Sequence, residues 1–120
     1  MVKRMSIYSL PEGTDPDKFW DYHKNIHAVD ALKVFGPALK KYVINRVISS
    51  HAVAPELEKQ IKFFDIVETW WENEEEMKQA YEKAKTFEVA SGKFFLEDWM
   101  SQIGWGVAFS VEEIVVKDIT

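Results

Sequence analysis

The sequence predicts an α+β fold in which a four-stranded antiparallel sheet carries both helices on a single face. Three observations support this prediction. The elements follow the order β-α-β-β-α-β, the helical segments are amphipathic, and the strand segments are rich in Tyr, Val, Ile and Trp. With 120 residues, of which 47% are hydrophobic and 29% charged, the chain suits one domain with its own core. We therefore expect residues 1–120 to form a single domain.

The first predicted strand covers residues 2–10, where residue character alternates up to the turn at Pro11. Thr14 or Asp15 is the expected N-cap of the first helix, and Pro16 suits its first position. This helix should extend to about Val34. At 100° per residue its apolar stripe comprises Phe19, Tyr22, Ile26 and Val29, with His23, His27 and Asp30 on the flank.

The second strand is expected at residues 41–49, followed by a polar loop near residues 50–60 that contains His51. Residues 63–71 form the most apolar predicted strand. The second helix should begin at the acidic run Glu74-Glu75-Glu76, because carboxylates stabilise a helix N-terminus, and fade near Ser91. Residues 93–100 suggest a short helical turn, and residues 107–117 supply the last strand.

This order is the split βαβ pattern of the ferredoxin-like fold. Two helices on one face leave the other face of the sheet open, and an apolar open face needs a cover. We expect that face to carry Tyr8, Trp70 or Trp71, and Ile and Val side chains. A second copy of the chain is the simplest cover, so the sequence predicts a homodimer.

Composition excludes several classes of function. The chain has no cysteine, which rules out disulfides, thiol nucleophiles and iron–sulfur clusters. A net charge of −5 without a basic run argues against nucleic acid and anionic membranes as partners. The first residues lack the apolar core of a signal peptide, and no segment is long enough to span a membrane, so a cytoplasmic protein is expected.

The aromatic content, 14% with five Trp and eight Phe, suits either a ring-filled core or an aromatic-lined pocket for a small apolar molecule. Glu68 shares a strand face with Phe64, Ile66 and Trp70, where an unpaired carboxylate is costly. An ion pair between Arg4 and Glu68 is one explanation, and a catalytic acid is the other. We expect the substrate-binding residues to include Tyr8, His23, Glu68, Trp70, Phe94, Phe95 and Trp99.

Three segments resemble a known family. Residues 19–28, FWDYHKNIHA, resemble the F-x-x-Y-x-x-x-H-A helix of EthD-like proteins. Residues 41–45, KYVIN, are similar to their second strand, and residues 64–71, FDIVETWW, to their third. The C-terminal third and the 50–61 loop do not match. The resemblance implies a ferredoxin-like domain that pairs into a dimeric α/β barrel.

The resemblance further implies that His27 is a pocket acid or base and that Tyr42 lies near it, so both are predicted catalytic residues. Tyr8 and Tyr42 are suited to donate hydrogen bonds to a developing oxyanion. The implied activity is that of a lyase or isomerase (dehydratase, cyclase or isomerase) that needs no cofactor and acts on a small hydrophobic cyclic or polyketide-like substrate.

Other functions stay open at this stage. A non-catalytic binding or stress-response domain would keep the pocket without the chemistry. A haem-binding protein or a cofactor-free monooxygenase is another alternative. His27, on a helix with Trp and Phe residues around it, could serve as a proximal haem ligand. His23, His27 and Asp30 are a possible two-His-one-carboxylate metal set, but all three lie on one helix, and we predict no metal site. The sequence has neither the Gly-x-Ser-x-Gly motif of a serine nucleophile nor a glycine-rich phosphate-binding loop.

Overall fold

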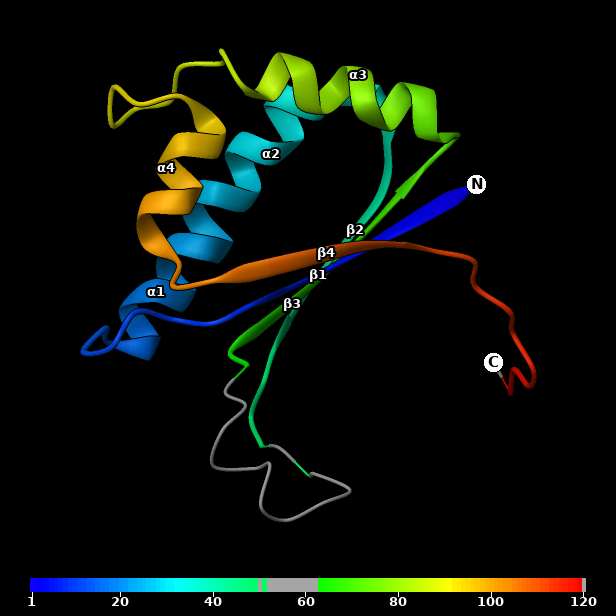
Figure 1. Cartoon of the computed structure of the whole chain (residues 1–120), viewed down its shortest axis with the longest axis horizontal. Coiled ribbons are helices and arrows are strands. Elements are labelled where there is room, and N and C mark those ends of the chain that lie inside the picture. The colour runs from blue at the N-terminus through cyan, green and yellow to red at the C-terminus, as the bar shows by residue number, and fades with distance from the viewer. Residues whose placement is uncertain (50, 52–62, 120) are drawn as a thin grey trace.

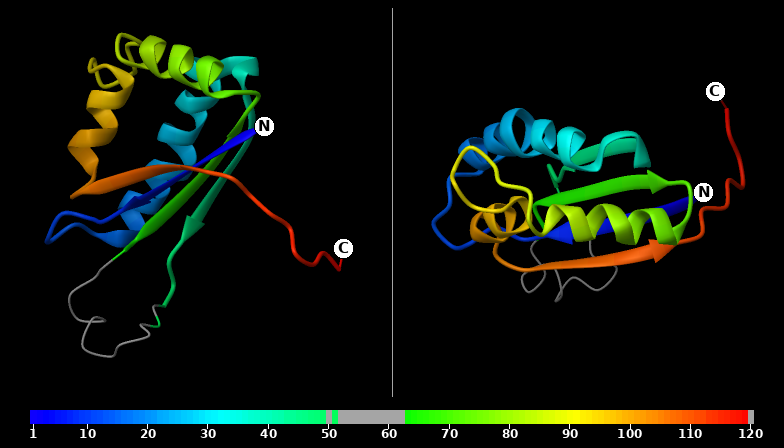
Figure 2. Two further views of the ribbon diagram at one scale, coloured as in Figure 1. Left: turned by 45° about the vertical axis from the view of Figure 1, so that its right-hand side comes forward. Right: turned by 90° about the horizontal axis from the view of Figure 1, so that it is seen from above.

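The computed structural model describes residues 1–49, 51 and 63–119. Figure 1 shows the helices on one side of the sheet, with the other side uncovered, and Figure 2 shows the same layers from two further directions. The elements in order are β1 (Val2–Tyr8), α1 (Pro16–Tyr22), a π-helical turn η1 (His23–His27), α2 (Ala28–Phe35), a 3₁₀ turn η2 (Gly36–Ala38), β2 (Leu39–Arg46), β3 (Asp65–Trp71), α3 (Glu74–Ala84), α4 (Phe95–Gln102) and β4 (Gly106–Val111).

All strand pairs in the sheet are antiparallel, and the strand order is β2-β3-β1-β4. This is the ferredoxin-like arrangement, so the predicted fold class is confirmed. The predicted helical turn at residues 93–100 is the full helix α4. The predicted last strand is too long, because Val111 pairs with Lys3 and β1 has almost no residues left to pair with those that follow.

The first helix is continuous through α1, η1 and α2, and its N-cap is Asp15, as the sequence predicts. Its buried face differs from the predicted stripe. Phe19 is buried as predicted, but Ile26 and Val29 are 49% and 43% exposed. His23 and His27, predicted on the flank, are buried instead. The π-turn explains the difference, because i→i+5 bonding widens the turn and keeps residues spaced by four on one side. Gly36, at φ 56°, then ends the helix in a conformation that favours glycine.

Alternation along the strands decides which residues face the helices. Arg4, Ser6 and Tyr8 of β1 face the helices, and Lys3, Met5 and Ile7 face the open side. The prediction that Tyr8 lies on the open face is therefore wrong. In β3, Trp71 is fully buried under the helices, while Trp70 lies on the open face between Lys3 and Lys41.

The same alternation overturns the predicted Arg4–Glu68 ion pair. Glu68 is on the open face, where it pairs with Lys3 at 2.8 Å and accepts a hydrogen bond from Asn45. The pairing holds the pKa of Glu68 below its usual value. Arg4 lies across from Thr69 on the opposite face, out of reach of the carboxylate.

The core consists of two clusters of buried side chains. One packs Trp71 and Phe35 against α3 residues such as Met77 and Ala80. The other joins Phe19, Trp99 and Ile103 near the start of α1 and the end of α4. Within the described ranges, no helix has the length and apolar character needed to cross a membrane.

Candidate functional site

A cavity of about 40 Å³ lies between the helix-facing side of the sheet and the helices. We call it the inner chamber. Side chains from β1, β2 and β3 reach it, and α2, α3 and α4 close it from the other side. Its polar or titratable lining residues are Ser6, Tyr8, His27, Tyr42, Thr69 and Tyr81, and its main apolar walls are Ala31, Phe35, Val67, Phe95, Leu96 and Trp99.

His27 lies against the aromatic wall of the inner chamber. Its imidazole stacks with Trp99, with ring centroids 4.0 Å apart, and with Phe95 at 4.7 Å. Burial, with a smaller contribution from His23, lowers the pKa of His27 to about 3. The imidazole is therefore neutral at neutral pH and free to accept a proton.

His23 lies behind His27 and is fully buried. Its Nδ1 is 2.5 Å from Oδ2 of Asp65, at the first position of β3, while its buried Nε2 has no hydrogen-bond partner among the described residues. Burial raises the pKa of the Asp65 carboxyl, and the contact with His23 opposes that rise. Among the described residues, no group of three His, Asp or Glu side chains is placed to hold a metal ion.

A second polar contact positions α4 over the chamber. The Tyr22 hydroxyl donates a 2.5 Å hydrogen bond to Oδ2 of Asp98, and the Ser91 hydroxyl donates to Oδ1 at 2.8 Å. Burial and the nearby carboxylate raise the pKa of Tyr22. This contact ties α4 to the first helix, and thereby fixes Trp99 against His27.

Two tyrosines bring hydroxyl donors to the chamber from the sheet. Burial raises the pKa of Tyr42, so its hydroxyl stays protonated and can donate. The Tyr8 ring packs edge-on against Trp99 at 5.0 Å. A side chain at Gly106 would meet the Tyr8 ring at 2.5 Å, so glycine there leaves room for Tyr8 in its chamber position.

A larger cavity of about 270 Å³ adjoins the inner chamber, and we call it the outer chamber. Tyr8, Tyr81, Leu96 and Trp99 line both, so the two share a wall. The outer chamber adds Arg4 and apolar residues of α4 and β4, including Met100, Ile103 and Ala108. Its volume is close to that of the smaller pockets that bind drug-sized molecules.

The structure gathers part of the predicted site. His27, Tyr42, Tyr8, Phe95 and Trp99 line the inner chamber, and His23 lies directly behind it. Three predicted residues lie elsewhere: Phe94 is the 43% exposed N-cap of α4, and Glu68 and Trp70 are on the open face of the sheet. His51 is exposed at the edge of the loop, whose other residues lie outside the described ranges.

Sequence reasoning missed Asp65, Asp98 and Tyr81. Asp65 begins an apolar strand and Asp98 directly precedes Trp99, so a carboxylate in apolar company was the available signal. Tyr81 lies in the predicted second helix, and no role in the site was predicted for it. Its position over Arg4 depends on how α3 docks on the sheet, and a single sequence gives no measure of that.

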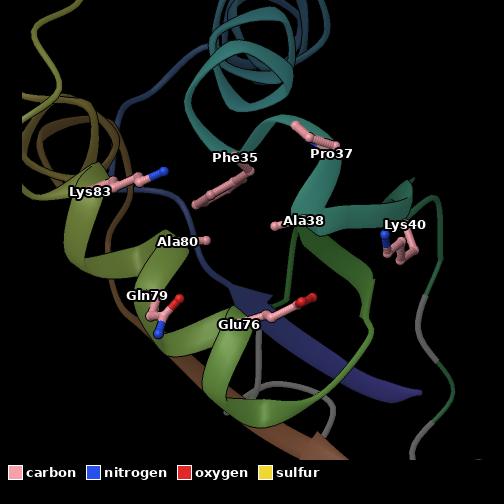
Figure 3. A pocket seen from close by; sticks show the side chains of 8 residues that line it. All are labelled: Phe35, Pro37, Ala38, Lys40, Glu76, Gln79, Ala80 and Lys83. Atoms are coloured by element: carbon pink, nitrogen blue, oxygen red, sulfur yellow. The ribbon is translucent and has the colours of Figure 1, made fainter.

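A separate groove of about 310 Å³ lies between α3 and the start of β2 (Figure 3). Its floor is apolar, with Phe35 and Ala80, and its rim carries Lys40, Glu76 and Lys83. The groove is far larger than the inner chamber, but none of its lining residues is a buried titratable group. For this reason we place the candidate site at the two chambers.

These features define a ferredoxin-like α+β protein with a ligand-sized space between sheet and helices. No protein-family model and no curated protein sequence matches the chain. Solved structures do match. An ethyl tert-butyl ether D (EthD) family protein from Bacillus halodurans is 27% identical, with a TM-score of 0.65 over 95% of this chain and 99% of that one. The chain is thus similar in sequence and structure to an EthD family protein, in agreement with the resemblance of residues 19–28, 41–45 and 64–71.

Two further structures extend the likeness in fold. An EthD-like protein from Ralstonia eutropha is 18% identical, with a TM-score of 0.64 over 97% of this chain and 95% of that one. A protein from Bacteroides fragilis, described as dimeric, ferredoxin-like and of unknown function, is 9% identical, with a TM-score of 0.61 over 93% and 95%.

Proposed function

We propose that the chain is a lyase or isomerase that acts by acid–base chemistry on a small, largely apolar cyclic or polyketide-like substrate. The observation that carries this proposal is the pairing, in one chamber, of a buried neutral imidazole with a protonated tyrosine hydroxyl. His27 supplies the first and Tyr42 the second.

In the proposed reaction, His27 takes a proton from the carbon next to a substrate carbonyl, and the electron pair moves onto the carbonyl oxygen. An imidazole with a pKa of about 3 is a base of roughly carboxylate strength. A base of that strength suffices where donors stabilise the oxyanion as it forms. Tyr42 and Tyr8 are the proposed donors. Return of the proton to another carbon gives isomerisation, and its delivery to a β-hydroxyl gives dehydration with loss of water.

The proposal includes a homodimer formed through the open face of the sheet. Phe109 and Val107 of β4 are 50% and 41% exposed there, beside Met5 and Ile7 of β1. A contiguous apolar area of this kind is typical of an interface. The dimeric description of the Bacteroides fragilis protein, which has the same fold, agrees with this arrangement.

Hydrogen–deuterium exchange tests the chemistry without knowledge of the natural substrate. In D₂O, wild-type protein should speed exchange of the α-hydrogens of 1-tetralone, a small bicyclic ketone, as followed by proton NMR. His27→Gln should lower that rate by about 10²–10⁴-fold while circular dichroism stays unchanged. Glu68→Gln is the matched control, since it changes a titratable residue on the opposite face and should leave exchange intact.

Equal rates for wild-type and His27→Gln protein would contradict the assignment of the base. A second candidate function, a non-catalytic binding domain, is favoured by the small volume of the inner chamber, which has room for a few water molecules only. That function predicts binding of apolar ligands with no acceleration of exchange. The haem alternative gains no support from the geometry, because the His27 ring is stacked on Phe95 and Trp99 in a chamber far smaller than a porphyrin.

A further inference from the structure

Among the described residues that line the two chambers, Arg4 is the only cation. It lies in the middle of β1, with the neutral residues Thr69 and Ser110 across from it on the neighbouring strands. Its guanidinium carbon is 4.3 Å from the ring centre of Tyr81. Its Nε atom is buried and has no hydrogen-bond partner among the described residues.

Within the part of the chain that the structure describes, no carboxylate forms an ion pair with Arg4, which is unexpected at this position. A guanidinium with a buried, unpartnered nitrogen is costly, and the chain has 20 acidic residues against 15 Lys and Arg. The adjacent residue, Lys3, takes two of those carboxylates, Glu68 at 2.8 Å and Glu113 at 2.7 Å. The residue before Arg4 thus has two carboxylate partners, and both lie on the other face of the sheet.

The surroundings of Arg4 suit a ligand that brings its own negative charge. Planar guanidinium groups bind carboxylates through two parallel hydrogen bonds. Burial raises the pKa of Tyr81 to about 12, so the ring that supports Arg4 remains uncharged and can donate a hydrogen bond. Leu96, Met100 and Ile103 give the outer chamber an apolar wall. Trp99 also lines this chamber, and its ring stacks on His27.

We propose that Arg4, supported by Tyr81, is an anion-binding subsite that receives the carboxylate of a ligand whose aromatic or alicyclic body fills the outer chamber. This inference rests on the proposed ligand site and narrows its substrate class to organic acids. In such a ligand the charged end lies at Arg4 and the reacting carbon points toward the inner chamber.

A pair of probes that differ only in charge tests this subsite. Calorimetric titration at neutral pH should show that 2-naphthoate binds wild-type protein at least about tenfold more tightly than the uncharged 2-naphthamide, a difference of about 1.4 kcal/mol. In Arg4→Gln protein the ratio of the two affinities should fall close to one. Arg46→Gln, which makes the same change at an exposed arginine paired with Asp17, should keep the wild-type ratio.

A second measurement needs no variant and so does not depend on the folding of Arg4→Gln protein. In wild-type protein, 2-naphthoate should shift the NMR signal of the Arg4 Nε–H group, and 2-naphthamide should not. Equal affinities for the two probes, an unchanged ratio in Arg4→Gln protein, an unmoved Arg4 signal, or no binding of either probe at millimolar concentration would each overturn the inference. If the protein does not speed hydrogen exchange of 1-tetralone, the acid–base proposal fails, but the binding measurements still test the Arg4 subsite. The two proposals can therefore fail independently.

Discussion

The two faces of the sheet satisfy their charges in opposite ways. On the open face, Lys3 is paired with Glu68 and Glu113 and lies over Trp70, so its ammonium group is well supplied with partners. On the helix-facing side, and counting only residues that the structure describes, Arg4 has no carboxylate partner, His27 is buried and neutral, and His23 Nε2 has no hydrogen-bond partner. Adjacent positions of β1 therefore carry one cation with two carboxylate partners, Lys3, and one with none among the described residues, Arg4. The difference indicates that the first face suits a protein partner and the second a small ligand.

The largest effect should come from a charge placed on the open face. Phe109→Asp should dissociate the proposed dimer, because an unpaired carboxylate would be buried at the centre of its interface. Light scattering at micromolar concentration should give about twice 14.0 kDa for wild-type protein and a lower mass for the variant. Leu32→Asp, at a position 60% exposed on α2, is the control and should stay dimeric. A wild-type mass near 14.0 kDa would show that the open face has no such partner.

The buried His27 on the helix-facing side should make the stability of the protein depend on pH. The pKa of His27 is about 3 in the folded protein and near 6.5 when unfolded, so the unfolded chain binds the extra proton between these values. Stability conferred by the neutral ring is thus complete above pH 6.5 and is lost as the pH falls toward 3. At pH 5 the loss should be about 2 kcal/mol. Urea titrations at matched protein concentration measure the free energy of unfolding, and His27→Gln protein should not show this loss. If the free energy of unfolding falls equally with pH in both proteins, His27 is not buried in its neutral form.

The smallest effect compares two neighbours in β1. Lys3→Met removes the partner of two carboxylates and should lower the free energy of unfolding by about 1 kcal/mol. Arg4→Met removes a cation that pairs with no carboxylate of the described ranges, so the stability of this variant should stay within about 0.5 kcal/mol of wild type or increase. Chemical denaturation measures both. A larger loss for Arg4→Met than for Lys3→Met would mean that Arg4 serves stability and not a ligand.

The fold was predictable from sequence because its signals are local. Asp15 with Pro16 marks the helix start, and strand-forming runs bounded by turn residues give the element order. The face assignments were less secure, because a shift of one residue exchanges the two sides of a strand, as the misplaced Tyr8 and the wrong partner for Glu68 show. The π-turn at residues 23–27 also has no sequence signal in a single chain, and it moves both histidines from the predicted flank into the core.

The candidate site was predictable where the EthD resemblance supplied it, at His27 and Tyr42. Residues that act through packing were not: Asp65 meets His23 only once the first helix docks on the sheet, and Asp98 and Tyr81 reach their partners only once α4 and α3 dock. Arg4 was predicted to pair with Glu68, and the failure of that pairing is what draws attention to it.

The most direct test of this account is a crystal structure of the protein with 2-naphthoate bound. The account predicts the carboxylate within hydrogen-bond distance of the Arg4 guanidinium and the naphthalene ring in the outer chamber against Trp99, on the helix-facing side of the sheet. A ligand found on the open face, or in the groove between α3 and β2, would contradict it.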